Sequence, residues 1–215
     1  MLRRREVLAA ASLPFSRDRP LRPGIPRSGR LAFRLLREGD PIGTHVLRFS
    51  AAAGGFDIGI SVHIAVRFGP FVLFRYDLRG VERWRGGVCA NVAARTNDDG
   101  TPAFMHAQRD ARGLWVTGSR TVRYLAPADA LPATHWNEAE LRGPWINVQD
   151  GRLLRPRVAS RGVDRVPLAD GQPVPAHHFV VSGDARLQLW YGARAMWTAL
   201  LFAAKDGSLV RYERM

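Results

Sequence analysis

The feature that most constrains this chain is a long stretch of strict two-residue periodicity. From Phe56 to Phe68 every even-numbered residue is apolar, whereas the odd-numbered residues are Asp, Gly, Ser, His, Ala and Arg. Successive side chains on a β-strand point to opposite faces, so one face of this strand enters a core. At about 3.3 Å per residue the stretch spans roughly 40 Å. A strand of that length is typical of a strongly curled sheet or an open half-barrel, and too long for a small sandwich.

Turn signals divide the rest of the chain into further strands. Phe68-Gly69-Pro70 predicts a turn into a partner strand, and Gly86-Gly87 predicts the next hairpin. Glycine supplies the positive φ that such turns need, and Asp or Asn satisfies the turn backbone. Further signals of this kind lie at 38–40, 53–55, 97–100, 110–113, 150–151, 170–171, 182–184 and 206–207. Hairpins join antiparallel neighbours, so the sequence predicts an all-β antiparallel meander.

One short helix is predicted over residues 133–141, because Pro132 suits a first helical turn. It separates a group of strands over 31–125 from a second group over 142–214. No internal repeat is visible, and no apolar run approaches the roughly 18 residues that cross a bilayer as a helix. The sequence therefore predicts a single β domain over residues 30–215.

Residues 1–29 have the layout of an export leader followed by a lead-in. Positive charge precedes a short apolar stretch, and Arg4-Arg5-Glu6-Val7-Leu8 resembles the twin-arginine pattern. Residues 16–29 are rich in Pro, Arg and Gly, which indicates an unstructured lead-in. The alternative is a disordered basic tail, since Pro14 interrupts the apolar stretch and no clean cleavage site precedes Ser16. We expect an exported, periplasmic protein.

The formal net charge of +13 first suggests nucleic acid or anionic lipid as a partner. Residues 1–30 hold eight arginines against Glu6 and Asp18, a net +6 that leaves +7 for the rest of the chain. Lys205 is the only lysine. An arginine bias of this kind is typical of codon usage and says little about a binding face. We therefore expect no nucleic-acid partner.

The motifs of the most recognisable enzymes and nucleotide-binding proteins do not occur in the sequence. It has no Gly-x-Ser-x-Gly elbow, no His-Glu-x-x-His, no Cys-x-x-Cys pair and no P-loop. The one cysteine, Cys89, lies in a strand-like setting, and we interpret it as a small buried hydrophobe. The sequence indicates no cofactor.

Six histidines are the remaining candidates for metal binding or acid–base chemistry. His177 and His178 are neighbours on a predicted strand, so they point to opposite faces and do not readily chelate one ion. His135 and Glu138 stand three residues apart on the predicted helix, but zinc prefers three or four protein ligands. His63 lies on the polar side of its strand. The histidines therefore support only a weak hypothesis, an enzyme with a polar lumen that uses His63, His135 and Glu138. Two stronger hypotheses, both for binding proteins, are given below.

Large aromatic side chains are frequent, with six Trp, ten Phe and four Tyr. Inside a curled sheet they can line a cavity for an apolar ligand, although each of them can equally be ordinary core. The candidate cavity residues are Phe74, Tyr76, Trp84, Trp115, Trp190 and Trp197.

The apolar face of a half-open sheet needs a cover, which a helix, a loop, a partner or a lipid can supply. The 133–141 segment and the proline-rich lead-in are too short to cover all of it. This favours a binding function over catalysis. The first hypothesis is a non-enzymatic envelope protein that binds a lipid or other apolar molecule in the curled sheet. The second is a scaffold that binds another envelope protein or itself.

Several hairpin segments resemble bacterial exported proteins of domain-of-unknown-function family 6134, which is related to the broader family 3108. The likeness spans most of residues 31–214 and lacks the acidic turn residue that such proteins often show after Trp190-Tyr191. It implies an exported all-β protein and transfers no catalytic residue. The segments that carry the likeness are Phe33–His45 with its Ile-Gly-x-His turn, Arg83–Gly87, Ala94–Gly100, Val181–Asp184, Leu189–Tyr191 and Phe202–Tyr212.

Overall fold

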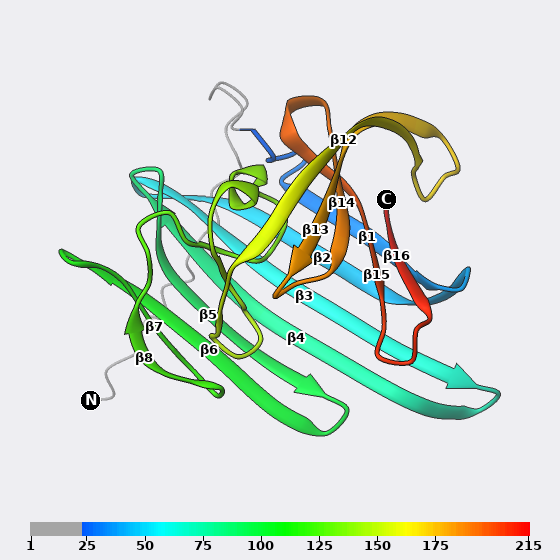
Figure 1. Cartoon of the computed structure of the whole chain (residues 1–215), viewed down its shortest axis with the longest axis horizontal. Coiled ribbons are helices and arrows are strands. Elements are labelled where there is room, and N and C mark those ends of the chain that lie inside the picture. Colours follow the sequence, from blue (N-terminus) through cyan, green and yellow to red (C-terminus); the bar gives the residue numbers. More distant parts are fainter. Residues whose placement is uncertain (1–22) are drawn as a thin grey trace, which may run out of the picture.

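The fold is an open antiparallel sheet of thirteen strands in a computed structural model that describes residues 23–215. The strand order is β12-β13-β14-β15-β16-β1-β2-β3-β4-β5-β6-β7-β8, so β12 and β8 are the two edges and the sheet is not closed into a barrel. Figure 1 shows the long strands crossing the molecule and the β12–β13 end curling over. The predicted all-β meander in a curled, open sheet is confirmed.

The turn signals of the sequence match the observed hairpins. The first group of strands comprises β1 (Arg30–Arg37), β2 (Asp40–Ala52), β3 (Gly55–Phe68), β4 (Phe71–Arg85), β5 (Val88–Asp98), β6 (Thr101–Asp110), β7 (Gly113–Gly118) and β8 (Thr121–Leu125). The second group comprises β12 (Pro156–Pro167), β13 (Pro173–Gly183), β14 (Leu187–Gly192), β15 (Met196–Ala203) and β16 (Leu209–Arg214). The last strand, β16, pairs with the first, β1, and this pairing joins the two groups into one sheet.

One face of the sheet, here called the inner face, carries the core. The even-numbered residues of β3 from Phe56 to Val62 are buried on it, as the alternation predicts. The opposite, outer face carries polar side chains such as His63, which pairs with Asp77 of β4.

A single segment, residues 126–152, covers the inner face between the two groups of strands. It appears yellow-green in Figure 1, lying across the sheet. Its Trp136 packs edge-on against Phe49, Phe56 and Trp84, and its Trp145 is also buried. This cover segment supplies from within the chain much of the cover that the sequence left to a partner or a lipid.

The connection between the two groups also holds the short elements. It contains a three-stranded sheet of β9 (Leu131–Pro132), β10 (Trp145–Ile146) and β11 (Leu153–Leu154), and the short 3₁₀ helix η1 (Glu138–Arg142). A second 3₁₀ turn, η2 (Ala193–Ala195), lies outside the connection, between β14 and β15. The predicted helix over 133–141 is therefore shorter and begins later. Pro132 pairs with Ile146 as a strand, and the side chain of Asn137 accepts a hydrogen bond from the Ala139 N–H and caps η1.

The described residues include only the end of the predicted leader and lead-in. Residues 1–22, with the twin-arginine-like pattern, lie outside the described residues. The expectation of an unstructured lead-in up to residue 29 is wrong for its end, because Ile25 is buried in the core and Gly24 donates to the carbonyl of Arg194. Within residues 23–215 no helix is long and apolar enough to span a membrane.

Candidate functional site

The six aromatic residues proposed as a cavity lining do not meet in one cavity. Trp84 and Trp197 are buried in the core of the inner face. Phe74 and Tyr76 lie along β4, where the Tyr76 hydroxyl accepts a hydrogen bond from Gln149 of the cover segment. Burial raises the pKa of Tyr76 above its ordinary value.

The remaining two aromatic candidates lie elsewhere on the molecule. Trp115 donates its indole N–H to Asp110, and the guanidinium groups of Arg112 and Arg123 lie 5.0 and 4.4 Å from its ring. Trp190 lies on β14, pointing away from the core. Of the six candidates, Trp190 is the one that lines the first of the two grooves described below.

The cover segment is held to the sheet by a buried carboxylate. Glu82 of β4 is fully buried and accepts hydrogen bonds from the indole N–H groups of Trp84 and Trp136, at 2.7 and 3.1 Å. Its other oxygen accepts from the hydroxyl of Thr134 at 2.5 Å. Burial raises the pKa of Glu82. These bonds tie the cover segment to β4, so the inner face is filled and fixed by the chain itself.

Two further buried polar groups lie nearby on the same face, the His135–Glu140 pair and His45. The ring of His135 contacts Glu140 with an N–O distance of 2.5 Å, and the Tyr191 hydroxyl donates to the carbonyl of His135. His45 is buried among Phe33, Trp197 and Tyr212, and neither of its ring nitrogens has a hydrogen-bond partner among the described residues. Burial, and secondly the charge of His135, lower the pKa of His45 to about 3.

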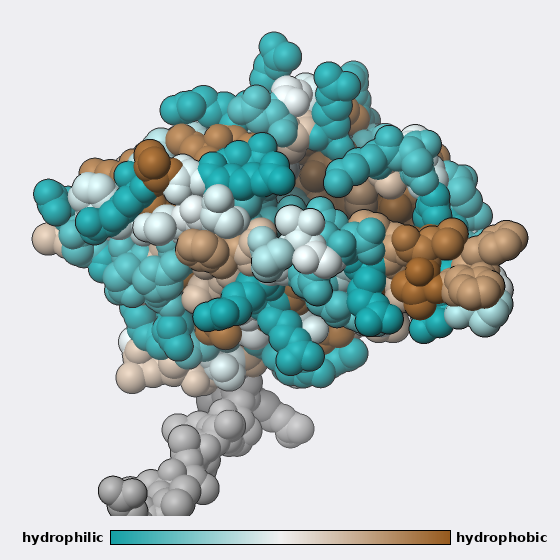
Figure 2. Space-filling view, turned by 90° about the horizontal axis from the view of Figure 1, so that it is seen from below, coloured by the Kyte–Doolittle hydropathy of each residue, from teal (hydrophilic) through white to brown (hydrophobic). Residues whose placement is uncertain are grey.

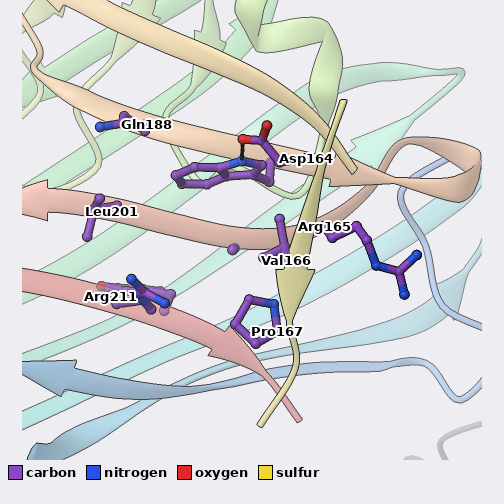
Figure 3. A pocket seen from close by; sticks show the side chains of 10 residues that line it. Asp164, Arg165, Val166, Pro167, Gln188, Leu201 and Arg211 are labelled. Atoms are coloured by element: carbon purple, nitrogen blue, oxygen red, sulfur yellow. Dashed lines mark hydrogen bonds between the residues drawn. The ribbon is translucent and has the colours of Figure 1, made fainter. Parts of the chain in front are cut away.

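A groove forms on the outer face because β12 bends. The pairing of β12 with β13 shifts register between Ser160 and Gly162, and Gly162 adopts φ +92°, which favours glycine. Beyond this bulge β12 crosses β14, β15 and β16 on their outer face, as Figure 3 shows. Ala169 then donates a backbone hydrogen bond to Arg214 at the end of β16. The groove lies under this crossing segment.

The floor of the groove is apolar and its rim is polar. Its volume is about 420 Å³, within the range of small-molecule sites. Val166 and Ala199 are buried there and pack with Trp190 in a cluster separate from the main core. Figure 3 shows Gln188, Leu201 and Arg211 on three successive strands, while Arg165 points away to the other side of β12. The residues that line the groove are Asp164, Arg165, Val166, Pro167, Gln188, Trp190, Ala199, Leu201, Arg211 and Tyr212.

One end of the groove is organised by Asp164. Its carboxylate accepts a hydrogen bond from the indole N–H of Trp190 at 2.9 Å and lies 3.0 Å from Nδ1 of His178. The His178 ring stacks on Trp190 with 4.4 Å between ring centroids, and its Nε2 lies 2.8 Å from Gln188. These contacts fix the Trp190 ring as one wall of the groove.

Arg211 lies away from Asp164 along the groove and carries its cationic group. It makes no ion pair with any residue of the described part of the chain, 23–215. An apolar floor with one unpaired guanidinium fits an amphipathic molecule with an anionic head, since the head gains a charge-assisted hydrogen bond and the tail covers apolar surface.

The three residues of the enzyme hypothesis do not converge. His63 is exposed on the outer face with Asp77, and His135 is tied to Glu140 on the inner side. Glu138 lines a second groove, of about 500 Å³, beside His177 and Arg194. Among residues 23–215 no three His, Cys, Asp or Glu side chains are placed to hold a metal ion.

Sequence reasoning missed the residues that organise both faces. Glu82, Asp164 and Arg211 occupy ordinary strand positions, and nothing in their spacing marks them. The exposed turn of β3 and β4 did leave a signal. Phe71-Val72-Leu73-Phe74 is a run of four apolar residues, which puts apolar side chains on both faces of one strand.

The comparisons with known proteins support the fold and the family. The family described as "Domain of unknown function (DUF6134)" matches residues 33–215. The fold resembles a crystal structure of a beta-barrel-like protein of the domain of unknown function DUF1849 from Brucella abortus. That match has a TM-score of 0.57 and 11% identity, and covers 86% of this chain and 94% of the other. No curated protein matches the chain.

Proposed function

The chain belongs to the DUF6134 family, and from this starting point we propose that it is an exported, non-enzymatic envelope protein that binds a lipid. The ligand is a single-chain lipid with an anionic head, and its site is the groove between β12 and β14–β16. The observation that carries the proposal is the combination of an apolar floor with the unpaired guanidinium of Arg211 at one end.

The inner face is the less suitable site. The cover segment already occupies it, and Trp84, Trp136 and Thr134 are all engaged by the one carboxylate of Glu82. A ligand there has to displace packed aromatic side chains. In the groove it has only water to displace, from apolar surface around Trp190 and Leu201, and that displacement favours binding.

The experiment is a titration of ¹⁵N-labelled full-length protein with laurate, followed by NMR of the six indole N–H groups. The Trp190→Phe variant identifies the Trp190 resonance by its loss. The expected result is a saturable shift of that resonance, with much smaller shifts of Trp84 and Trp136. A titration that leaves Trp190 unchanged contradicts the proposal.

Two variants test the two ends of the groove. Leu201→Glu places a carboxylate in the floor opposite Arg211, its cross-strand partner, and we expect at least a tenfold loss of laurate affinity. Arg211→Gln removes the cation and weakens binding roughly fivefold to tenfold, equivalent to about 1 kcal/mol. The matched controls are Val81→Glu and Arg95→Gln, on the outer face of β4 and β5, which leave laurate affinity unchanged. Equal losses in test and control variants reject the groove as the site.

A further inference from the structure

The turn of the β3–β4 hairpin stands free of the rest of the sheet. The pairing of β3 with β2 ends at Ile64, and the pairing of β4 with β5 ends at Tyr76. In the ladder, residues 65–75, here called the tip, therefore pair only with one another. A further backbone bond lies at the base, where the Asp99 N–H donates to the carbonyl of Arg75. The four residues of β3 beyond Ile64 extend roughly 13 Å at 3.3 Å per residue.

The tip is the most apolar exposed part of the described chain. Phe68, Phe71 and Leu73 are 75%, 67% and 63% exposed. Figure 2 shows apolar side chains gathered at the right-hand end of the molecule, where the β3–β4 turn lies in Figure 1. Leaving such side chains in water costs free energy, and a contiguous exposed cluster of them marks a contact surface. Packing within the sheet does not explain these exposed apolar side chains, because no other strand pairs with the tip.

Two arginines flank the apolar cluster. Arg67 and Arg75 are exposed, and neither forms an ion pair with a residue of the described range 23–215. The acidic residues that lie nearest to the tip are Asp98 and Asp99, at its base. Asp99 accepts a hydrogen bond from the backbone N–H of Arg75, and Asp98 lies 3.9 Å from Lys205. The tip itself is therefore apolar and cationic.

We propose that this tip inserts into the surface of a bilayer that contains anionic lipids. An apolar cluster rimmed by arginine has the chemistry of an interfacial anchor, in which aromatic side chains enter the acyl boundary and cations meet the headgroups. Its length of roughly 13 Å is enough to reach the roughly 5–10 Å depth to which interfacial elements sink. The proposal is independent of the groove, although both assign the protein a lipid partner.

The shape and charge of the tip favour a bilayer over a second protein. A narrow hairpin turn presents a small convex surface, whereas a stable protein interface buries about 800 Å² on each partner. Two copies that meet tip to tip also bring four arginines together. A bilayer needs no complementary surface and accepts a protruding turn.

The experiment places an environment-sensitive fluorophore on the tip of the full-length protein. Leu73→Cys is labelled with nitrobenzoxadiazole in a Cys89→Ala background, with Val122→Cys, at a position 86% exposed on the edge strand β8, as the matched control. Vesicles contain phosphatidylcholine and phosphatidylglycerol at 7:3. We expect a blue shift at position 73 and its quenching by brominated acyl chains, and no change at position 122.

Binding variants complete the test. In vesicle sedimentation we expect Phe68→Ser with Phe71→Ser to reduce the partition coefficient at least fivefold, and Arg67→Gln with Arg75→Gln to reduce it about threefold on anionic vesicles only. Val122→Ser is the control and leaves partitioning unchanged. The fluorophore reports on the tip alone, so binding through residues 1–22 does not imitate insertion. A protein that sediments with vesicles while position 73 stays in water overturns the proposal, as does burial of the tip in a dimer seen without lipid.

Discussion

The two faces of the sheet carry the same small motif in two environments. On the inner face the carboxylate of Glu82 receives indole N–H groups from Trp84 and Trp136 and is 0% exposed. On the outer face the carboxylate of Asp164 receives the indole N–H of Trp190, and its side chain is 46% exposed. The first motif closes a core, and the second lines an open groove. On the inner face, the 27 residues of the cover segment lie over the motif. On the outer face, only the bent strand β12 crosses over it.

We infer from this difference that the inner face contributes mainly to stability and the outer face mainly to ligand binding. A buried carboxylate that satisfies several donors is costly to disturb, because each donor left without a partner carries its own desolvation penalty. A half-exposed carboxylate exchanges its partners with water at small cost. We therefore expect inner-face variants to unfold the protein and outer-face variants to change ligand affinity.

The largest effect is expected from Glu82→Leu. It leaves the indole N–H groups of Trp84 and Trp136 and the hydroxyl of Thr134 buried without an acceptor, and the free energy of unfolding should fall by about 3–5 kcal/mol. Urea denaturation followed by tryptophan fluorescence measures it. A loss below about 1 kcal/mol shows that the cover segment is not held by this carboxylate.

Glu82→Gln is the matched control, because it keeps an acceptor and removes the charge. Burial raises the pKa of Glu82 above its ordinary value of 4.5, so the folded state binds the proton more tightly than the unfolded state. The stability linked to this proton is full below pH 4.5 and is lost as the pH rises through the raised value. Relative to Glu82→Gln, the wild-type protein should therefore lose stability with rising pH. A constant difference between the two proteins contradicts the burial of a charge.

A smaller effect of opposite sign is expected from His45→Phe. Burial lowers the pKa of His45 to about 3, so the folded state holds the ring neutral while the unfolded state takes up a proton below about pH 6.5. The stability that depends on the neutral ring is therefore lost as the pH falls from 6.5 toward 3. His45→Phe should gain about 2 kcal/mol more at pH 5 than at pH 8, at 1.36 kcal/mol per pH unit. Thermal unfolding at the two pH values checks it, and equal gains contradict a buried neutral ring.

The smallest effect on stability is expected from Asp164→Asn. The carboxylate is half-exposed and its contact with His178 is screened by water, so the loss should stay below about 1 kcal/mol. The same variant should weaken laurate binding about threefold, because a neutral amide oxygen is a weaker acceptor for the indole N–H of Trp190 than the carboxylate and orients the ring less firmly. Urea denaturation and the NMR titration measure the two effects. A stability loss comparable to that of Glu82→Leu removes the distinction between the faces.

The sequence predicted the sheet well because its signals are local. The alternation over Phe56–Phe68 and the glycine turns specify strands and their antiparallel order without any tertiary information. The extent of the cover segment was not predicted. Residues 133–141 were expected to cover only part of the apolar face, because the contacts that join Trp136 to Phe49 and Phe56 link residues far apart in the chain. The helix over 133–141 was placed too early for the same reason, since the pairing of Pro132 with Ile146 is a tertiary choice.

The candidate site was predicted only in part. Trp190 was among the aromatic candidates, but Trp84 and Trp197 face the core, and the alternation alone does not tell a filled face from an open one. The groove depends on the bend at Gly162, and a glycine in a strand does not reveal where the bent strand will cross. The leader, the periplasmic location and the lipid stay predictions.

The most direct test of the account locates the lipid on one face. Intermolecular nuclear Overhauser effects between ¹³C-labelled laurate and the bound protein identify the side chains that contact its acyl chain. We predict contacts from the laurate methylenes to the ring of Trp190 and the methyl groups of Leu201 and Val166. Contacts to Trp84 and Trp136 instead, or no contacts at saturating laurate, would contradict it.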